Sequence, residues 1–379
     1  MTLRKLLVKI HLCLGLLASS VVIIIGLSGA MLVFEQEVDQ ALHPHLWRII
    51  PREGKVPLQS IVDAVEEAYR PRSFLTVEIQ TDPERPYVLS TETDFQVFVN
   101  PYSGEILGER EHAQTFFGVM FALHRTLLAG EVGRRVVGVV TLLVVFLVGT
   151  GLYLWWPRTT ARVKSSLSLR WAAGWRRLNY DLHNVLGFYA SWYLVVIALT
   201  GLVWSFSLVH DALFWLTGSP PPPWKSRPLS TATGTGPGIT LDEAMRKADE
   251  VIPGAGATEI MLPQRPQDSI SFVKRSPGAL NPNAQHFVSL DQYTGAILRV
   301  DRYEELSWGA TMRLLVYPIH VGSIFGRATQ ILALLVSVLV AVSAITGVLL
   351  WWQKQTPERR ARDPYLSLPK SELTTSRKP

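Results

Sequence analysis

Charged side chains are scarce in this sequence. Only 18% of its 379 residues are Asp, Glu, Lys or Arg, whereas 48% are hydrophobic. Soluble globular domains carry about 25% charged residues, so this balance argues against a soluble enzyme. The single cysteine, Cys13, excludes a disulfide within the chain and the C-x-x-C-H motif that attaches c-type haem. No G-x-G-x-x-G follows a strand pattern, so nothing indicates a built-in domain for NAD(P)H or flavin.

Long apolar runs are abundant by contrast. Four segments are long enough to cross a hydrocarbon core about 30 Å thick, which takes about 20 helical residues. They run from His11 to Phe34, from Val136 to Trp156, from His183 to Phe206 and from Ala328 to Trp352, and none has a charged residue in its interior. The first exceeds a typical signal-peptide core and lacks a clear cleavage site, which favours a membrane anchor. The sequence therefore predicts four transmembrane helices.

Lys and Arg are concentrated on one side of these spans. The 158–182 loop holds Arg158, Arg162, Lys164, Arg170, Arg176 and Arg177, and the 353–379 tail adds Lys354, Arg359, Arg360 and Arg362. The positive-inside rule places both segments, and the amino terminus, in the cytoplasm. Residues 35–115 and 207–312 then face outward. The net charge of +6 follows from this topology and gives no sign of a nucleic-acid partner.

The two halves of the chain repeat one another, as a search for internal repeats shows. His11, Gly15, Ser19, Ser28, Gly29 and Phe34 of the first span match His183, Gly187, Ser191, Thr200, Gly201 and Phe206 of the third. His124, Gly130, Thr150, Gly151, Trp155 and Trp156 match His320, Gly326, Thr346, Gly347, Trp351 and Trp352. The outward segments share a strand–glycine turn–strand block, 99–107 and 290–298, which follows a helical pattern over 58–69 and 241–251.

The predicted fold is thus an α-helical integral membrane protein with four transmembrane helices from an internal duplication and two extracytoplasmic α+β modules. The predicted units are 1–34 (first span), 35–115 (first module), 116–157 (interfacial helix and second span), 158–182 (cytoplasmic loop), 183–206 (third span), 207–312 (second module), 313–352 (interfacial segment and fourth span) and 353–379 (cytoplasmic tail). The Pro-rich run 219–224 and the Gly/Thr stretch 230–238 are typical of an extended spacer.

Four of the nine histidines fall at matching positions of the repeat. His11 and His183 begin spans that run outward, so both lie near the cytoplasmic surface. His124 and His320 precede spans that run inward, within apolar stretches (116–128 and 314–325) that we predict to be short helices at the outer surface. One histidine pair at each surface is what two stacked haems with two axial histidines each require. A zinc or copper site is the alternative, but no Asp or Glu accompanies the histidines inside the spans.

Small residues follow the histidines at helical spacing. Gly15 lies one turn after His11, and Gly29 lies eighteen residues after it, which is five full turns and roughly 27 Å along the helix. Gly187 and Gly201 repeat this pattern in the third span. A flat macrocycle beside a helix needs positions without side chains, so we predict that these glycines border the haems. Helix packing is the competing explanation for small residues in a span.

Other polar residues near the predicted outer surface have two interpretations each. Arg134 and Arg327 are candidates for binding haem propionates, although anchoring at the membrane edge explains them almost as well. His43 and His45 follow the first span, where a solvated loop is favoured over contact with substrate or metal. We interpret the remaining histidines, His112, His210 and His286, as surface or packing residues.

Several of these motifs resemble the PepSY-associated transmembrane family. They are His11-x3-Gly, Leu182-His-Asn-x2-Gly, the paired Thr-Gly-x3-Trp-Trp endings and the repeated Tyr-[Ser/Thr]-Gly block. The resemblance extends from His11 to Trp352. It implies a multi-pass protein of a bacterial inner membrane with periplasmic modules and two b-type haems, held by His11, His183, His124 and His320. Within the family the chain is most similar to ferrisiderophore reductases.

That similarity implies transmembrane electron transfer to a ferric siderophore. Hard oxygen donors such as hydroxamates hold Fe(III) far better than Fe(II), so one electron releases the metal. The electron donor is expected to be quinol or a separate protein, and the chelate is expected to reach the outer haem through a cleft between the two modules. Two alternatives stay open: a haem-free transporter, which needs polar groups or broken helices at mid-membrane, and a PepSY-type signalling or peptidase-modulating protein without a cofactor.

Overall fold

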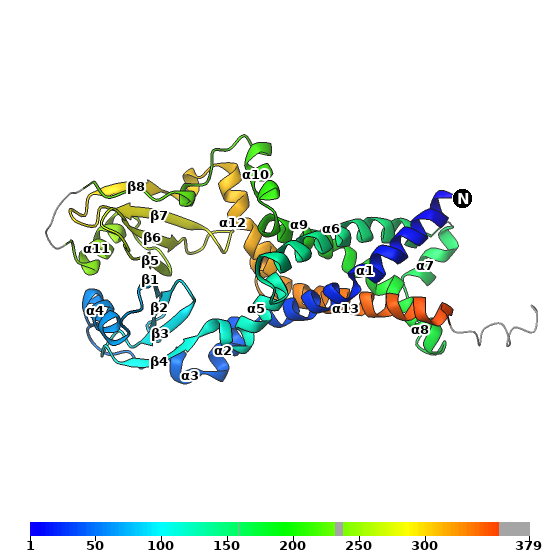
Figure 1. Ribbon diagram of the computed structural model, residues 1–379, viewed down its shortest axis with the longest axis horizontal. Helices are drawn as coiled ribbons and strands as arrows, with labels where there is room; N and C mark the ends of the chain where they lie inside the picture. Colours follow the sequence, from blue (N-terminus) through cyan, green and yellow to red (C-terminus); the bar gives the residue numbers. More distant parts are fainter. Residues whose placement is uncertain (158, 232–237, 356–379) are drawn as a thin grey trace, which may run out of the picture.

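The structure is a computed structural model that describes residues 1–157, 159–231 and 238–355. A bundle of long helices forms one end of the molecule, and a β-sheet with its covering helices forms the other (Figure 1). Arg158, the middle of the predicted 230–238 spacer and the predicted tail beyond residue 355 lie outside the described residues.

Four helices of the described residues are long and apolar enough to cross a membrane, as the sequence predicts. They are α1 (Leu3–Leu32), α6 (Gly130–Trp155), a continuous stretch over Trp175–Ser205, and α13 (Arg327–Gln355). The third consists of α8 (Trp175–Asp181), the π-helical turn η3 (Leu182–Leu186) and α9 (Gly187–Ser205).

Three of these helices begin well before the apolar runs that predicted them. Helix α1 starts at Leu3 instead of His11, and α6 starts at Gly130 instead of Val136. Hydropathy marks where an apolar run begins, whereas Lys and Arg are good helix formers and extend the backbone ladder past that point. As a result His11 and His183 lie about two turns inside their helices, on rigid backbone.

The bundle packs through small residues. Ala18 and Val22 of α1 form a buried cluster with Val140 and Val144 of α6. Helix α1 also packs along α13, where a Cβ added at Gly26 would lie 2.9 Å from the carbonyl oxygen of Ser337. Close approach of backbones at small residues is the usual way in which membrane helices associate.

Two shorter helices connect the sheet to the bundle. Helices α5 (Phe116–Thr126) and α12 (Trp308–Val321) precede α6 and α13, with the N-caps Thr115 and Ser307 accepting hydrogen bonds from backbone N–H groups. The link from α5 to α6 is shorter than the gap that the sequence predicts between the apolar stretch ending at residue 128 and the span starting at Val136. The link is short because Leu127 and Leu128 turn the chain in left-handed conformations, with φ of 51° and 58°. Helix α12 starts six residues before the predicted residue 314.

The remaining helical segments are short. They are α2 (Glu35–Leu42), α3 (Pro44–Trp47), α7 (Val163–Ser166), α10 (Ser207–Leu216), η1 (His112–Gln114), η2 (Thr160–Arg162), η4 (Pro223–Lys225), η5 (Tyr303–Glu305) and η6 (Ser323–Phe325). His43 and His45 therefore belong to a helical corner and not to the solvated loop that the sequence favoured, because Pro44 at the first position starts α3.

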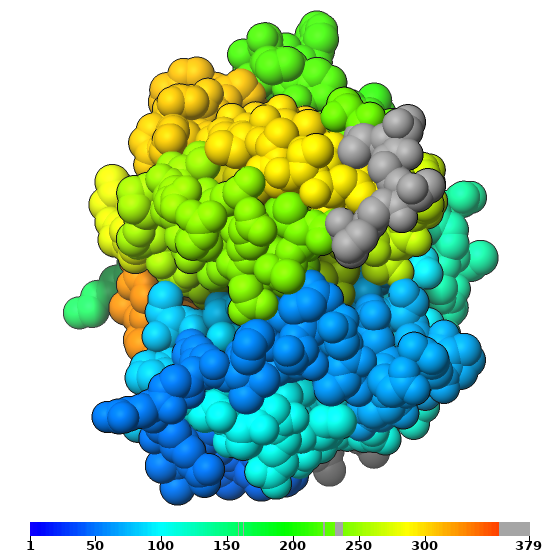
Figure 2. All heavy atoms as spheres, turned by 90° about the vertical axis from the view of Figure 1, so that its left-hand side faces the viewer, coloured from blue at the N-terminus to red at the C-terminus, as the bar shows by residue number. Residues whose placement is uncertain are grey.

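The eight strands of the described residues join one antiparallel sheet. They are β1 (Phe74–Ile79), β2 (Tyr87–Thr91), β3 (Phe95–Val99), β4 (Ile106–Glu111), β5 (Thr258–Met261), β6 (Ile270–Arg275), β7 (Gln285–Leu290) and β8 (Ile297–Asp301), in the order β4-β3-β2-β1-β5-β6-β7-β8. The order is symmetrical about the β1–β5 pair, where Val77 lies opposite Ile260. The two predicted modules thus share one sheet, and Figure 2 shows them directly against each other.

Helices α4 (Leu58–Ala68) and α11 (Leu241–Val251) supply the core of this part. Their apolar sides and the strands form one buried cluster that includes Ile61, Phe74 and Phe272. A hollow of about 650 Å³ lies between the modules, lined by residues 55–58 at the start of α4, by Ile79 and Tyr87 of the sheet and by α11. In Figure 1 these helices lie at the end farthest from the bundle. This hollow therefore does not lie beside His124 and His320, and a substrate cleft next to that pair stays a prediction.

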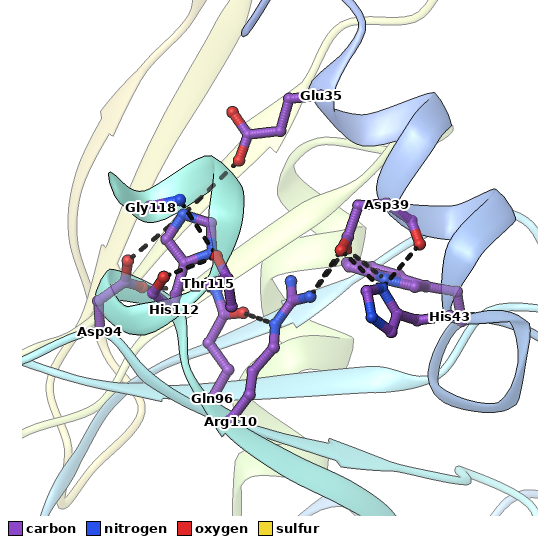
Figure 3. A network of polar contacts seen from close by, with 10 residues as sticks. Glu35, Asp39, His43, Asp94, Gln96, Arg110, His112, Thr115 and Gly118 are labelled. Carbon is purple, nitrogen blue, oxygen red and sulfur yellow. Dashed lines mark hydrogen bonds and ion pairs between the residues drawn. The ribbon is translucent and has the colours of Figure 1, made fainter. Parts of the chain in front are cut away.

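A buried ion pair joins α2, the short helix that follows the first transmembrane helix, to the sheet. The guanidinium of Arg110 on β4 donates to both carboxylate oxygens of Asp39 on α2 at 2.9 and 2.8 Å, and Trp47 donates to the same carboxylate at 2.8 Å (Figure 3). Burial alone would raise the pKa of Asp39, but the bonds from Arg110 and Trp47 outweigh it and hold that pKa below its ordinary value. His112 lies nearby, between Glu35 and Asp94.

Replacing Arg110 with alanine is expected to destabilise the sheet by about 3–5 kcal/mol, because it leaves the Asp39 carboxylate buried without its partner. Thermal unfolding in detergent measures this, with Arg85→Ala, which breaks an exposed pair with Asp82, as the matched control. The lowered pKa also predicts that the contribution of Asp39 is present above about pH 4 and is lost as the pH falls through its folded pKa. Equal melting temperatures for both variants would contradict the assignment.

Candidate functional site

The structure brings the four repeated histidines together in two pairs. The ring centroids of His11 and His183 are 6.4 Å apart, and those of His124 and His320 are 6.1 Å apart. Bonds from imidazole nitrogen to a metal ion are about 2 Å long, so two imidazoles that bind one ion from opposite sides have ring centroids about 6 Å apart. Each pair therefore has the spacing of two axial ligands of one metal.

Hydrogen bonds fix the rings of the first pair. The hydroxyl of Thr150 donates to the carbonyl of Phe146 at 3.1 Å, so it accepts the bond that joins it to Nδ1 of His11 at 2.9 Å. The Nδ1–H of His183 donates to the carbonyl of Ser343 at 3.0 Å. With the proton on Nδ1, Nε2 of each ring is left with its lone pair for a metal ion.

The second pair is held in the same way. The Nδ1–H of His124 donates to the carbonyl of Ile25 at 2.8 Å, and that of His320 donates to the carbonyl of Ile197 at 3.0 Å. Burial lowers the pKa of His124 and lowers that of His320 to about 4. Both imidazoles are therefore neutral near pH 7, which is the form that ligates iron.

A glycine on a neighbouring helix makes room for each ring. A Cβ added at Gly29 would lie 2.8 Å from Cε1 of His124, and one added at Gly201 would lie 3.3 Å from Cε1 of His320. The sequence predicted open space for a macrocycle at these two glycines, but their neighbours are the ligand rings themselves. Helical spacing places a glycine at one end of the span and does not tell which group fills the space beside it.

The first pair, His11 and His183, has corresponding glycines. A Cβ added at Gly151 would lie 3.4 Å from His11, and one added at Gly347 would lie 3.2 Å from His183. Gly15 has no atom within 4 Å of such a Cβ. That free space beside His11 is what a flat macrocycle would need, so the residues present fit a haem. At Gly187 the nearest atom, the Ser343 hydroxyl oxygen, is 3.9 Å away.

A comparison with protein families finds a match that covers these histidines. The model of the PepSY-associated TM region matches residues 8–354. The chain belongs to this family. The match includes all four paired histidines and both halves of the sheet. A comparison with curated proteins finds no match to the sequence.

The two predicted arginines of this PepSY-associated protein have acidic partners. Arg134 forms two hydrogen bonds with Glu131 and donates to the carbonyl of Ser205 at 2.6 Å. Arg327 pairs with Glu37. Their binding to propionates stays a prediction, and binding would require them to share or exchange these partners.

Sequence reasoning named Gly29 and Gly201 as site residues, but it missed the other residues against which the histidines of this family member lie. Each histidine lies against a Ser-Gly or Thr-Gly dipeptide of another helix: 28–29, 150–151, 200–201 and 346–347. The hydroxyls of Thr150, Thr200 and Thr346 lie within 3.3 Å of an imidazole Nδ1. The sequence contains a signal for this role, because these dipeptides recur in register in both halves. Their role was hidden because each lies far from its histidine in the sequence.

Proposed function

We propose that this protein is a b-type haem reductase of a bacterial inner membrane, with two haems that carry electrons across the bilayer. The observation that carries the proposal is the pair of bis-histidine sites. His124 packs on Gly29, which lies roughly 27 Å along α1 from His11. One helix therefore reaches both sites, at opposite ends of its span.

The donor set favours haem over a bare metal ion. Each site offers two imidazoles, and among the described residues no group of three or more His, Cys, Asp or Glu side chains is placed to hold a metal ion. A haem supplies four further nitrogen ligands from its own ring and needs only the two axial histidines. Zinc or copper would need ligands that these sites do not offer.

The protein positions the haems and limits their chemistry. When bound, each haem would accept and pass on one electron at a time. His11 with His183, and His124 with His320, would fill both axial positions, which leaves no iron coordination site for oxygen or other small ligands. The carbonyls of Ser343, Ile25 and Ile197 hold the rings in one tautomer. Outer-sphere electron transfer is the reaction that this arrangement supports.

The proposed topology has both termini in the cytoplasm and the sheet in the periplasm. The sheet lies at one end of the bundle, and the amino terminus lies at the other end (Figure 1). The basic residues of the 159–182 loop and Lys354 belong to the end away from the sheet, as the positive-inside rule requires. The lipid bilayer then surrounds the four apolar helices.

A ferric siderophore, for example a hydroxamate complex, is the proposed substrate. One electron converts Fe(III) to Fe(II), which hydroxamate oxygens hold weakly, so reduction releases iron. The electron would come from quinol or from a separate protein. The transporter alternative is less well supported, because α1, α6 and α13 run unbroken and the π-helical turn of the third span lies at the His183 end.

The absorption spectrum of the purified protein tests the cofactor. We expect a Soret band, an α-band at the b-type position after dithionite, and two haems per chain. Haem that stays on the protein in denaturing electrophoresis would indicate a covalent link, which the single cysteine does not support. A colourless protein purified from haem-replete cells would refute the reductase proposal.

Pre-reduced protein tests the substrate. We expect a ferric hydroxamate siderophore to reoxidise both haems and to release Fe(II), which a ferrous-specific chelator traps in a one-to-one ratio with the electrons lost. The gallium complex of the same siderophore is the control, because Ga(III) cannot accept the electron. Haems that no ferric siderophore reoxidises would remove the substrate from the proposal and leave the electron-transfer role intact.

A further inference from the structure

Trp204 links the outer histidine pair to an arginine. Its ring lies against the imidazole of His320, with centroids 5.1 Å apart and planes at 82°. The guanidinium carbon of Arg313 lies over the same indole, 5.6 Å from its centroid. Arg313 and His320 are both on α12, seven residues apart, which places them on nearly the same face and roughly 10 Å apart along the helix. Arg313 is thus directly outward of the outer site.

Arg313 has no acidic partner in the part of the chain that the structure describes. It forms no hydrogen bond or ion pair with any of the described residues, and its Nε atom is buried. Burial lowers the pKa of its guanidinium, as expected for a cation that is removed from water without compensation. By contrast, Arg134 and Arg327 of the same end are each paired with a glutamate. The half-buried guanidinium loses part of its hydration and has no anion to compensate for it, so an anionic ligand is favoured at this position.

The fold does not require an arginine at this place. The residue seven positions before His124 in the first half is Phe117, which is buried. Helix α5, which carries Phe117, packs against α1 and α6 in the same way as α12 packs against α9 and α13. An apolar side chain therefore satisfies the packing of such a helix, and packing alone does not explain the guanidinium of Arg313.

We propose that Arg313 binds a carboxylate at the outer site. The carboxylate belongs either to a propionate of the outer haem or to an anionic ferric chelate, and in both cases the proposal rests on the proposed haem function. A guanidinium binds a carboxylate through two parallel hydrogen bonds, and it gains most where water is excluded. Trp204 keeps the guanidinium in place by stacking and separates it from the imidazole of His320.

The experiment compares Arg313→Gln, Arg313→Lys and Arg313→Phe, which copies the residue of the first half, in the full-length protein. Arg125→Gln is the matched control, because Arg125 is an exposed arginine next to His124 whose guanidinium lies over Phe121. An unchanged Soret band at two haems per chain shows that a variant folds. The readouts are the reduction potentials of the two haems, the rate of haem transfer to apomyoglobin, and reoxidation by two ferric chelates.

If the carboxylate is a propionate, the Gln and Phe variants lower the potential of one haem and leave the other unchanged. Loss of a nearby cation favours the ferric form, and a tenfold change in the reduction equilibrium is about 59 mV for one electron. We also expect about tenfold faster loss of that haem. Arg313→Lys restores most of the potential, because it keeps the charge.

If the carboxylate belongs to the chelate, both haems leave the same variants at the wild-type rate. Reoxidation by ferric citrate then slows about tenfold, while reoxidation by a neutral ferric trihydroxamate does not change. Wild-type rates of haem transfer together with wild-type reoxidation rates for both chelates would overturn the assignment of Arg313. Such a result would leave the haem proposal standing, since that proposal fails only if the wild-type protein is colourless.

Discussion

His11→Ala is expected to halve the haem content, from two per chain to one. The substitution leaves the inner iron with a single axial imidazole from His183, whereas the outer pair is untouched. The outer site is roughly 27 Å away along α1, and substitutions at such separations act independently. Haem per polypeptide after extraction, together with the Soret absorbance, measures the loss. The remaining haem should keep the spectrum and potential of the outer site.

Matched variants make this result specific. His183→Ala should remove the same haem, and the His11/His183 double variant should lose no more than either single variant, because both residues serve one iron. His124→Ala should remove the other haem. His45→Ala is the control, because His45 is exposed and lies outside both pairs. Loss of both haems from a His11 variant that still folds, or of neither, would show that the pairing is wrong.

The helical part of the fold was predictable from local signals. The spans follow from apolar runs longer than any soluble helix needs, and the histidine pairs follow from the repeat and the alternation of loops across the membrane. The helix of the second module was placed correctly at 241–251, because its pattern of buried Leu241, Ala244 and Ala248 has helical period. Helix ends were less accurate, because helices extend beyond their apolar stretches.

The joined sheet was not predictable in this way. The β1–β5 pair that unites the modules connects segments about 180 residues apart, and β5 has only four residues. The sequence of an edge strand does not tell whether the strand pairs with a second module or faces solvent. The hydrogen bonds between strands are made by backbone groups, which every residue type has. The hollow between α4 and α11, and the position of Arg313 beside Trp204, follow from this tertiary packing and have no local signature.

The glycines show the same division between local and tertiary information. Helical arithmetic placed Gly29 five full turns after His11, and in the structure α1 runs unbroken over both residues. The identity of its neighbour depends on α5, whose approach is set by the Leu127–Leu128 turn and by the bond from His124 to Ile25. A repeat can therefore identify positions of a site before it tells what each position contacts.

Gly29→Ala is expected to release the outer haem while the inner haem stays. The new Cβ would lie 2.8 Å from Cε1 of His124 and 3.0 Å from its Nδ1, which is closer than van der Waals contact permits. The imidazole must move, and it then loses both its bond to Ile25 and its place opposite His320. Disturbance of the groups that orient a metal ligand lowers affinity about 10–100-fold. Haem content and the rate of haem transfer to apomyoglobin measure this loss.

Gly15→Ala is the matched control on the same helix, because a Cβ there meets no protein atom within 4 Å. It keeps His124 in place, so the outer haem should be retained. Gly201→Ala should give a milder loss than Gly29→Ala, since its Cβ would lie 3.3 Å from His320, a distance that a small ring shift relieves. Equal retention of the outer haem in the Gly29 and Gly15 variants would mean that His124 does not hold it from this position. The order Gly29, Gly201, Gly15 in loss of the outer haem is therefore the result that ties the close packing of glycine and imidazole to cofactor binding.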